Sequence, residues 1–474
     1  MPGVDFLQLN AADAPPGGIA TWLTDALRAA IGDGRLTTGD RLPPSRGMAA
    51  GLGVSRGVVV EAYQRLVDEG LAVAEGARGT RVAAVPRQMP ATAPTTAEPR
   101  SDRVDLSPGL PDLSAFPRAA WLRCTRAVLA EVPAAELGYG DPQGHPRLRA
   151  ELARWLSRSR GVRAAAEDVV VVAGVAQALA LTAQVLVDRG DRDIAVEDPG
   201  SQGTREELER WGLRTRPVPV DGDGMDVDAL AATGASAALL TPAHQFPTGV
   251  VLSPERRRAL VGWAELDRFV VEDDYDAEHR YDRAPVPALQ GLVPDQVVYA
   301  GSVSKTLAPG LRLGWVVAPA TLCAALTRAK YMADLGNPVL DQLVFARFLA
   351  SGEFERHLWR VRIRQRARRD AMLGALREHL PRAQVLGVAA GLHLLVTLPA
   401  RNNDTADDVA LAAAADAAGV LVHPLSSHRI TPGPPGLVLG YAAQAPDRIR
   451  EAIARLGTAV GSASRAAGHR ARRG

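Results

Sequence analysis

Lysine is almost absent from this sequence. Only two of its 55 basic residues are lysine, Lys305 and Lys330, and all the others are arginine. Arginine stays protonated in proteins and cannot act as an amine nucleophile, whereas lysine can. A lysine that remains in such an arginine-rich chain is therefore a candidate for chemistry that arginine cannot perform.

Cysteine and long apolar runs are also scarce. The two cysteines, Cys124 and Cys323, are far apart and in no metal-binding spacing, which argues against a disulfide framework. No apolar run approaches the roughly 18 residues that a membrane span needs, and no signal-like segment opens the chain. The sequence therefore predicts a cytoplasmic protein that uses neither a membrane nor a metal site.

Charge of one sign is not in large excess either. The formal net charge is only +2 over 474 residues, so the chain as a whole is not a basic nucleic-acid coat. Any DNA binding must come from a local surface. The length is enough for two or three domains.

The chain divides into four parts by composition and pattern. A compact block at residues 17–84 is followed by a Pro/Ala/Thr-rich stretch at residues 85–103, which predicts a linker. Short apolar runs such as Val169–Ala173 then alternate with amphipathic patterns over residues 104–461, which indicates a mostly parallel sheet covered by helices. Residues 462–474 are rich in arginine and predict a disordered basic tail.

The first block has the pattern of a helix-turn-helix. A short helix is expected at residues 45–52, Gly53 makes the turn, and Ser55 is expected to cap a second helix; two short strands around Gly76 and Gly79 then predict a β-wing. The eight arginines of this block are nearly balanced by seven acidic residues, so an ordinary solvated domain is the alternative. We favour DNA binding because several polar residues lie at the helix starts or on the wing: Arg41, Ser45, Arg46, Ser55, Arg56 and Arg78.

Residues 39–82 resemble a GntR-type winged helix-turn-helix. The likeness covers most of the block, with one departure: Gly57 stands where such domains often carry a polar or basic contact residue. The run Gly53–Gly57 also fits the G-x-S-x-G pattern of esterases, but that motif needs a strand before the serine, and a helix is expected here.

The surroundings of Lys305 carry a second resemblance. The run Ser302–Gly314 is similar in spacing to the cofactor-lysine motif of fold-type I aminotransferases. The resemblance implies that Lys305 holds pyridoxal 5'-phosphate (PLP) as an imine, the internal aldimine. Ser302, Ser304 and Arg312 would supply donors for the cofactor phosphate. Ser304 precedes the lysine where a P-loop needs glycine, which excludes a Walker motif.

Two further segments fit the same cofactor. The apolar run 269–271 leads into an acidic run, and we assign Asp273 to the pyridinium nitrogen and Tyr275 to the ring hydroxyl. The alternative is that residues 272–276 form a solvated loop. Gly174, Val175 and Ala176 follow a predicted strand and open a predicted helix, whose free N–H groups would bind phosphate.

The order of these segments resembles the MocR-type regulators, in which a winged helix precedes an aminotransferase-like domain. This implies a winged helix-turn-helix followed by an α/β fold-type I domain with a small C-terminal α/β domain, a homodimer, double-stranded DNA as partner, and PLP or an amino-acid-like effector. Two departures concern amino-acid turnover. Ser201 replaces the usual stacking aromatic, and Val438 stands where relatives carry a carboxylate-binding arginine; Arg429 is near enough in sequence to substitute for it.

Three functions remain open at this point. The first is a PLP-responsive transcription regulator, in which PLP itself is the effector. The second is a working PLP-dependent aminotransferase with a regulatory DNA-binding domain. The third is a PLP-binding protein whose helix-turn-helix only mediates dimerisation, which Arg46 and Arg56 argue against.

Overall fold

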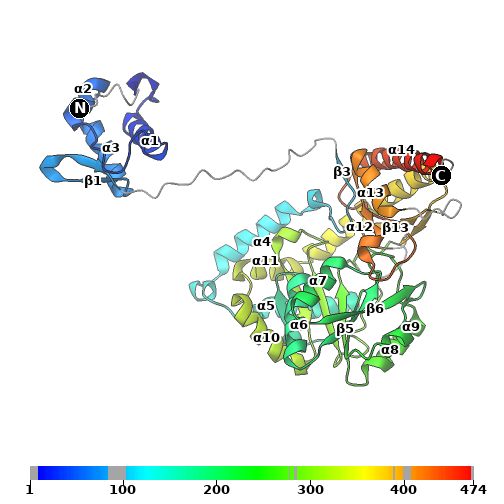
Figure 1. Ribbon diagram of the computed structural model, residues 1–474. Helices are drawn as coiled ribbons and strands as arrows, with labels where there is room; N and C mark the ends of the chain where they lie inside the picture. The colour runs from blue at the N-terminus through cyan, green and yellow to red at the C-terminus, as the bar shows by residue number, and fades with distance from the viewer. Residues whose placement is uncertain are drawn as a thin grey trace. The chain divides into compact units, whose positions relative to one another are not determined.

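The structure has two compact units. A computed structural model describes residues 9–83, 103–276, 278–281, 286–387, 390–398 and 407–470, without the side chains of residues 77 and 462–470. The units are Met1–Pro99 and Arg100–Gly474, and each is considered by itself (Figure 1). The predicted linker lies outside the described residues except for its last residue, 103.

The first unit is a winged helix-turn-helix, as predicted. Gly53 adopts a left-handed conformation (φ 66°) and makes the turn, a conformation that glycine adopts without steric cost. Its principal elements are α1 (Ile19–Gly32), α2 (Ser45–Leu52), α3 (Arg56–Asp68), β1 (Ala72–Ala74), η3 (Gly76–Arg78) and β2 (Thr80–Val82).

The helices of this unit are held by a small apolar core. Leu23 and Leu27 of α1 and Val59 and Leu66 of α3 are fully buried in it. The two strands pair antiparallel and form the wing. Ser55 occupies the N-cap position of α3, but its side chain makes no capping hydrogen bond, so the capping role predicted for it is wrong.

The second unit is built on an eight-stranded sheet in the order β4-β11-β10-β9-β8-β5-β6-β7. The four neighbouring pairs from β10 to β6 are parallel, while β11 and β7 pair antiparallel with their neighbours. The mostly parallel sheet is therefore confirmed. The strands are β4 (Val169–Val172), β5 (Asp193–Asp198), β6 (Arg214–Asp221), β7 (Gly224–Met225), β8 (Ala237–Leu240), β9 (Phe269–Asp274), β10 (Val297–Ser302) and β11 (Gly314–Val317).

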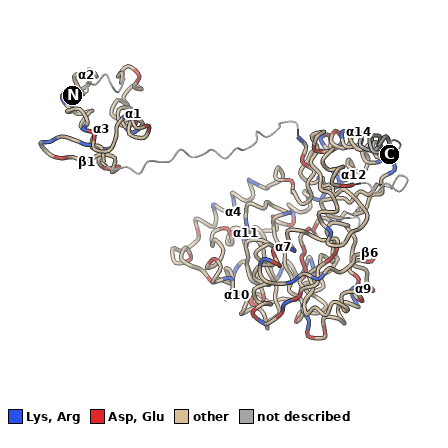
Figure 2. Tube along the Cα trace, in the orientation of Figure 1, with Lys and Arg blue, Asp and Glu red and all other residues tan. Residues whose placement is uncertain are grey.

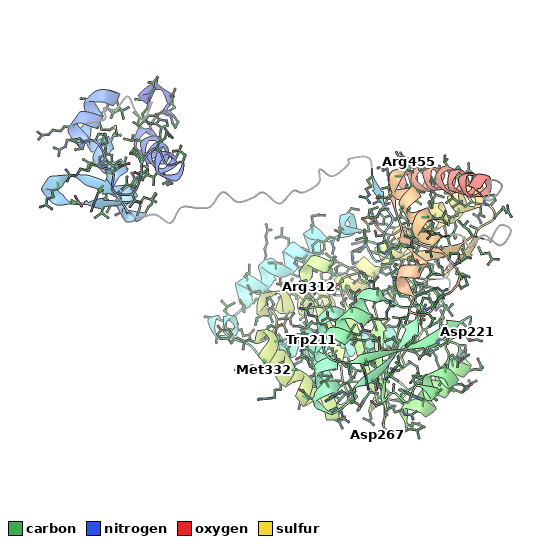
Figure 3. All side chains as sticks on the ribbon, viewed as in Figure 1. Trp211, Asp221, Asp267, Arg312, Met332 and Arg455 are labelled. Carbon is green, nitrogen blue, oxygen red and sulfur yellow. The ribbon has the colours of Figure 1, made fainter. Side chains whose placement is uncertain are left out.

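Helices cover both faces of this sheet, which is why its strands are apolar throughout. One core packs β4 and β10 against α6 (Val175–Asp188) and α10 (Ala320–Asp334). The opposite core contains α4 (Arg118–Glu131), α5 (Pro146–Arg160) and α11 (Val339–Ala350). Beside the β5–β8 region lie α7 (Gln202–Arg210), α8 (Val227–Ala232) and α9 (Pro254–Ala264). Side chains fill the space between these layers (Figure 3).

A smaller α/β domain follows, as predicted. Its antiparallel sheet has the order β12-β13-β16-β15. β3 (Val104–Asp105), from the start of the unit, pairs with β14, so both ends of the unit contribute to this domain. The other elements are α12 (Glu353–His379), β12 (Gln384–Leu386), β13 (His393–Thr397), α13 (Asp408–Ala417), β14 (Val420–Leu421), β15 (His423–Pro424), η8 (Leu425–His428), β16 (Leu437–Gly440) and α14 (Pro446–Arg470).

The predicted C-terminal tail begins inside α14. This helix packs Ile449, Ile453 and Leu456 into the small domain's core and continues to Arg470. The prediction of a disordered segment from residue 462 is therefore wrong up to residue 470, because alanine and arginine both favour continuation of a helix. Within the described ranges, no helix has the length and apolar character to cross a membrane.

Candidate functional site

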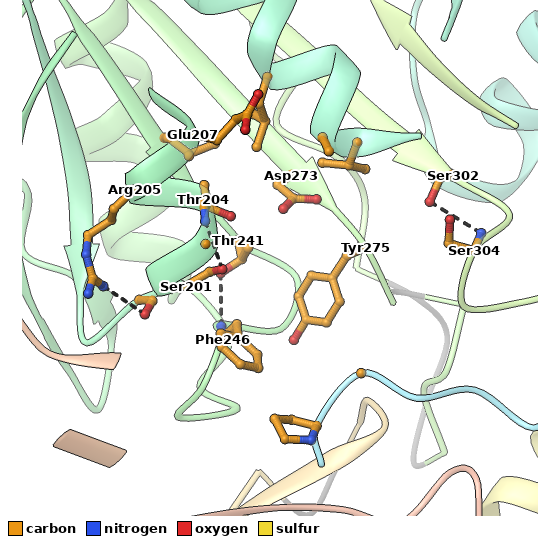
Figure 4. Close-up of a pocket in the computed structure, with 18 of the residues that line it drawn as sticks. Ser201, Thr204, Arg205, Glu207, Thr241, Phe246, Asp273, Tyr275, Ser302 and Ser304 are labelled. Carbon is orange, nitrogen blue, oxygen red and sulfur yellow. Dashed lines mark hydrogen bonds between the residues drawn. The ribbon is translucent and has the colours of Figure 1, made fainter. Parts of the chain in front are cut away.

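A cavity of about 440 Å³ opens at the carboxyl ends of the central parallel strands. This is the edge at which open α/β sheets bind ligands. Eight of the nine residues predicted to bind the cofactor line the cavity, and Gly174 is next to it (Asp273, Tyr275, Ser302 and Ser304 are labelled in Figure 4). The eight are Val175, Ala176, Asp273, Tyr275, Ser302, Ser304, Lys305 and Arg312.

Lys305 lies in the loop that follows β10, with its amine in the cavity. The Nζ atom donates a hydrogen bond of 2.6 Å to the carbonyl oxygen of Gly109. Burial lowers the pKa of Lys305, although the negative charges of Asp276 and Asp273 oppose the shift. A larger share of the amine is therefore neutral, the form that attacks a carbonyl carbon.

Asp273 comes from the end of β9 and faces the same cavity. Its Oδ1 atom is buried and has no hydrogen-bond partner among the residues that the structure describes. Burial, followed by repulsion from Asp274 and Asp276, raises the pKa of Asp273 to about 7. A buried carboxylate without a partner is costly, and a cationic group bound beside it would relieve that cost.

The rest of the acidic run has a structural role. Successive side chains of a strand point to opposite faces, so Asp274 points away from Asp273. There it forms a buried ion pair with Arg160 (2.7 Å) and accepts a hydrogen bond of 2.5 Å from Tyr299. Glu272 is fully buried and accepts hydrogen bonds from the backbone of residues 289 and 290. The alternative of a solvated loop is therefore wrong for residues 272–274.

The part of the cavity beside the start of α6 is suited to a phosphate. Gly174 (φ 96°) occupies the N-cap of α6 and offers no side chain to cap the first N–H groups. A Cβ atom on it would lie only 3.4 Å from the guanidinium nitrogens of Arg312. No hydrogen bond or ion pair of that guanidinium occurs within the described ranges. Ser302 and Ser304 lie nearby, and the Ser304 amide donates to the Ser302 hydroxyl (3.4 Å).

Lys330, the other lysine, is accounted for by structure. It is fully buried, and its Nζ atom lies 2.5 and 2.6 Å from the two carboxylate oxygens of Asp334. Asp334 also accepts a hydrogen bond from Gln177, whose own side-chain oxygen accepts from the backbone of Ala173. Lys330 thereby supports the start of α6 and does not reach the cavity.

Several residues that line the cavity were not predicted from the sequence. Gly109 comes from a segment almost 200 residues before Lys305, and no motif marks it. Phe246 and Arg205 also line the cavity. Phe246 lies inside the run 241–249, which resembles the turn beneath the cofactor in aminotransferases of this fold type, but the resemblance assigned no role to Phe246 itself. Arg205 donates to the carbonyl oxygens of Gly200 and His428 (3.0 and 3.1 Å).

The structure changes the interpretation of the two departures. Ser201 lines the cavity and caps α7, where its hydroxyl accepts from the Thr204 amide (3.3 Å). Val438 packs in an apolar cluster with Leu395 and Leu425 and does not line the cavity. Relatives carry a carboxylate-binding arginine where this chain has Val438, but in this chain residue 438 does not face the cavity.

Arg429 does not line the cavity either, so it is not the substitute that the sequence suggested. Its guanidinium packs so closely on Gly433 that a Cβ atom there would lie 2.2 Å from Nη1.

The residues predicted to contact DNA lie at the starts of two helices and on the wing of the first unit. Ser45 and Arg46 open α2, Arg56 opens α3, and Arg78 ends η3. The Nε atom of Arg56 donates to the Ser45 hydroxyl (3.3 Å), which brings the two helix starts together. Ser55 is the exposed residue before α3, and Arg41 precedes α2 and is exposed as well.

The arginines of this unit fall into two sets. Arg28, Arg35, Arg65 and Arg81 each form an ion pair with a carboxylate. Arg41, Arg46, Arg56 and Arg78, the four predicted to contact DNA, form no ion pair within residues 9–83. Figure 2 shows both signs of charge along the unit. The exposed cations that remain for a phosphate backbone are therefore the four at the helix starts and the wing.

Comparison with known proteins agrees with both units. Residues 20–82 match the family model of bacterial regulatory proteins of the gntR family, and residues 111–456 match that of aminotransferase class I and II. The chain is 36% identical to the probable rhizopine catabolism regulatory protein MocR of Rhizobium meliloti, covering 91% of each chain. It is 34% identical to the pyridoxine biosynthesis transcriptional regulator PdxR of Corynebacterium glutamicum, covering 94% of this chain and 96% of the relative.

A solved structure extends the comparison of the second unit. The α-aminoadipate aminotransferase LysN of Thermus thermophilus, crystallised with N-(5'-phosphopyridoxyl)-L-leucine, superposes with a TM-score of 0.68 at 30% identity. The match covers 76% of this chain and 93% of that one.

Proposed function

Because this chain belongs to the MocR-type family, in which a GntR-type DNA-binding domain precedes an aminotransferase class I and II domain, we propose that it is a transcription regulator whose DNA binding responds to PLP. The observation that carries the proposal is the buried Oδ1 atom of Asp273, which has no hydrogen-bond partner among the described residues, in one cavity with the amine of Lys305. The same chain carries four exposed arginines at the helix starts and the wing of its first unit, which form no ion pair within residues 9–83.

PLP, when bound, supplies an aldehyde that condenses with an amine and a pyridine ring that withdraws electrons. The residues of the cavity fit this group. Lys305 would hold it covalently, Asp273 would balance the charge of the ring nitrogen, and Tyr275 would donate to the ring oxygen. The start of α6, together with Ser302, Ser304 and Arg312, would bind the phosphate through charge-assisted hydrogen bonds.

Two further features support a function as a PLP-responsive transcription regulator. The Corynebacterium glutamicum relative is named as a regulator of pyridoxine biosynthesis, which makes PLP the natural effector to test. Ser201 gives the cavity no aromatic ring at the position where aminotransferase-like relatives stack one on the cofactor, which would loosen PLP and suit a sensor. A regulator that binds DNA would work in the cytoplasm.

We also propose a homodimer, because the second unit exposes apolar side chains around the end of α10. Tyr139 is 93% exposed, and Leu137, Met332 and Leu335 are each between 46% and 71% exposed. The loop that carries Tyr139 packs against residues 336–339, since Cβ atoms on Gly140 and Gly336 would contact Val339 and Pro142. Such a patch is the kind of surface that a second subunit covers.

Replacing Asp273 by Asn is expected to weaken PLP binding by about tenfold or more, because the ring nitrogen loses its counter-charge.

The stability of the PLP-free protein should not fall with the same substitution. The pKa of Asp273 rises from 3.8 to about 7 on folding, so the carboxylate destabilises the folded chain as pH rises through that interval. Apo Asp273→Asn should therefore be at least as stable as the parent above pH 7, and the difference should fade toward pH 4.

Equilibrium dialysis and thermal unfolding of the apo-protein measure the two effects separately. Unchanged PLP affinity in the variant would contradict the assignment of Asp273. Weaker binding together with a less stable apo-protein would mean that the substitution merely damages the fold.

The proposed function is tested by capturing genomic fragments on the full-length protein and sequencing them with and without added PLP. We expect one small set of promoter-proximal fragments, with an occupancy that changes when PLP is present. Identical occupancy in both conditions would remove PLP as the effector, and the absence of any enriched fragment would remove the regulatory function.

The second candidate is an active aminotransferase with a regulatory DNA-binding domain, in which an amino acid is the substrate or effector. Arg205 favours it, because this cation lines the cavity and, among the described residues, hydrogen-bonds only to backbone carbonyls. Mixing the PLP-loaded protein with a panel of amino acids separates the candidates. Rapid loss of the visible absorption together with keto-acid formation would identify the enzyme.

A further inference from the structure

A buried histidine lies directly behind Tyr275. His244 comes from the segment between β8 and α9, and both it and Asp276 are 1% exposed. Its Nδ1 atom is 3.0 Å from the Tyr275 hydroxyl oxygen and 2.9 Å from a carboxylate oxygen of Asp276. One ring nitrogen therefore contacts both a hydroxyl and a carboxylate, although it carries either one hydrogen or one lone pair.

The charge of Asp276 determines whether Nδ1 of His244 carries a hydrogen or a lone pair. Burial alone would raise the pKa of Asp276, but interactions led by those with His244 lower it below its ordinary value. The favoured form of Asp276 is therefore the carboxylate, which can only accept hydrogen bonds. A bare Nδ1 would bring its lone pair against this carboxylate at 2.9 Å. The favourable arrangement places the hydrogen on Nδ1 and donates it to Asp276.

The surroundings of Nε2, the other ring nitrogen of His244, disfavour a hydrogen on that atom. Nε2 is buried and has no hydrogen-bond partner among the described residues. It packs against two glycines, since Cβ atoms on Gly249 and Gly391 would lie 3.2 and 2.7 Å from it. An N–H group there would be a buried donor without an acceptor, which is costly. His244 is therefore the neutral tautomer with its hydrogen on Nδ1.

Tyr275 keeps its own hydrogen. Burial, followed by the negative charges of Asp276 and Asp273, raises the pKa of Tyr275 well above its ordinary value. Because Nδ1–H is donated to Asp276, His244 offers no lone pair to the tyrosine hydroxyl. The Asp276 carboxylate is the other acceptor near the Tyr275 hydroxyl. Because its Oδ2 atom already accepts Nδ1–H, the tyrosine hydrogen can turn into the cavity that the side chain lines.

We propose that His244 and Asp276 are positioning residues that direct the Tyr275 O–H into the cavity, toward the ring oxygen of PLP. This inference rests on the proposed function, since it requires PLP in the cavity. His244 and Asp276 would hold the Tyr275 O–H in its donating orientation before PLP binds. His244 itself would not touch the cofactor, and neither would Asp276, because neither lines the cavity.

The same atoms could be mistaken for a metal site, because single ligand atoms of His244, Asp276 and His393 lie within 4.8 Å of one another. However, the Nδ1 atom of His244 already bonds to Asp276, and Nε2 packs on glycine backbone. His393 is occupied as well, since its Nε2 atom lies 3.2 Å from the Pro247 carbonyl oxygen. The other titratable groups around the Tyr275–His244–Asp276 set are Asp273, Glu197, His279, His393 and Lys305.

The test is a pH titration of the visible absorption of the PLP-loaded, full-length protein. Tyr275→Phe removes the donor to the ring oxygen and should raise the midpoint pH by about one to two units. Asp276→Asn removes the carboxylate charge and, with its amide nitrogen turned toward Nδ1, frees a lone pair of His244 for the tyrosine hydrogen. It should raise the midpoint in the same direction and by a similar amount.

A double variant separates positioning from general damage. In the Tyr275→Phe background, Asp276→Asn should cause almost no additional shift, because there is no hydroxyl left to direct. His428→Asn is the matched control, since His428 is another buried imidazole beside Phe246 that does not contact Tyr275. It should leave the midpoint unchanged. If Asp276→Asn does not fold, ¹⁵N NMR of the histidine-labelled parent shows directly whether Nδ1 of His244 carries the hydrogen.

Each failure has a distinct meaning. A parent protein that never acquires visible absorption with PLP contradicts the proposed function itself. A parent that does acquire it, with an unshifted Asp276→Asn midpoint or a full second shift in the double variant, overturns the positioning role alone. The role is equally overturned if a chelator reproduces the Asp276→Asn shift, because the cluster would then hold a metal ion.

Discussion

Lys305→Ala is expected to abolish covalent attachment of PLP and with it the visible absorption of the protein. The amine of Lys305 is the only lysine amine among the residues that line the cavity, and its lowered pKa favours the reactive neutral form. Lys305→Arg should lose the attachment just as completely, although it keeps the positive charge, because a guanidinium does not form the bond. Absorption spectra and intact mass after borohydride reduction measure the loss.

Lys330→Arg is the matched control for this prediction. Lys330 is the other lysine of the chain and is bound to Asp334 inside α10. The variant should take up one PLP per chain and absorb like the parent. Attachment that persists in Lys305→Ala, or that disappears in Lys330→Arg while the protein stays folded, would show that the wrong lysine has been assigned.

Arg56→Ala is expected to weaken specific DNA binding by about 1–3 kcal/mol if the side chain contacts a base. Arg56 opens α3, the helix that enters the major groove in this class of domain, and it forms no ion pair within the first unit's described residues. If it binds only phosphate, all sequences should lose affinity alike, and the dependence of log K on log salt should flatten by about 0.9.

Arg65→Ala is a matched control on the same helix. Arg65 pairs with Glu61 at 2.6 Å and donates to Thr21 (2.9 Å), so it is already committed within the protein. Its replacement should change DNA affinity little. Mobility-shift titrations at two salt concentrations distinguish the outcomes, and an equal loss in both variants would mean that Arg56 has no special contact with DNA.

Much of the fold could be predicted because local signals agree with one another. The run of four valines at β4, the proline after Ser253 at the start of α9, and the left-handed Gly53 each determine a local structure with little help from distant residues. Ser55 shows the limit of such signals. A serine before a helix is compatible with a cap, but the orientation of its hydroxyl depends on surroundings that the pattern does not contain.

The site was predictable where chemistry is carried by contiguous motifs. The runs around Lys305, Asp273 and Gly174 could each be interpreted alone, and the fold brings them to one cavity. Gly109 could not be found, because its contact with Lys305 joins segments 196 residues apart. The orientation of Val438 likewise depends on its packing against Leu395 and Leu425. Such long-range relations leave no trace in a single sequence.

The most direct test of the account is to load the full-length protein with PLP, reduce it with borohydride, and map the modified peptide by mass spectrometry. We expect one adduct per chain, on the peptide that contains Ser304, Lys305 and Thr306. An adduct on Lys330, or no adduct at all, would contradict it.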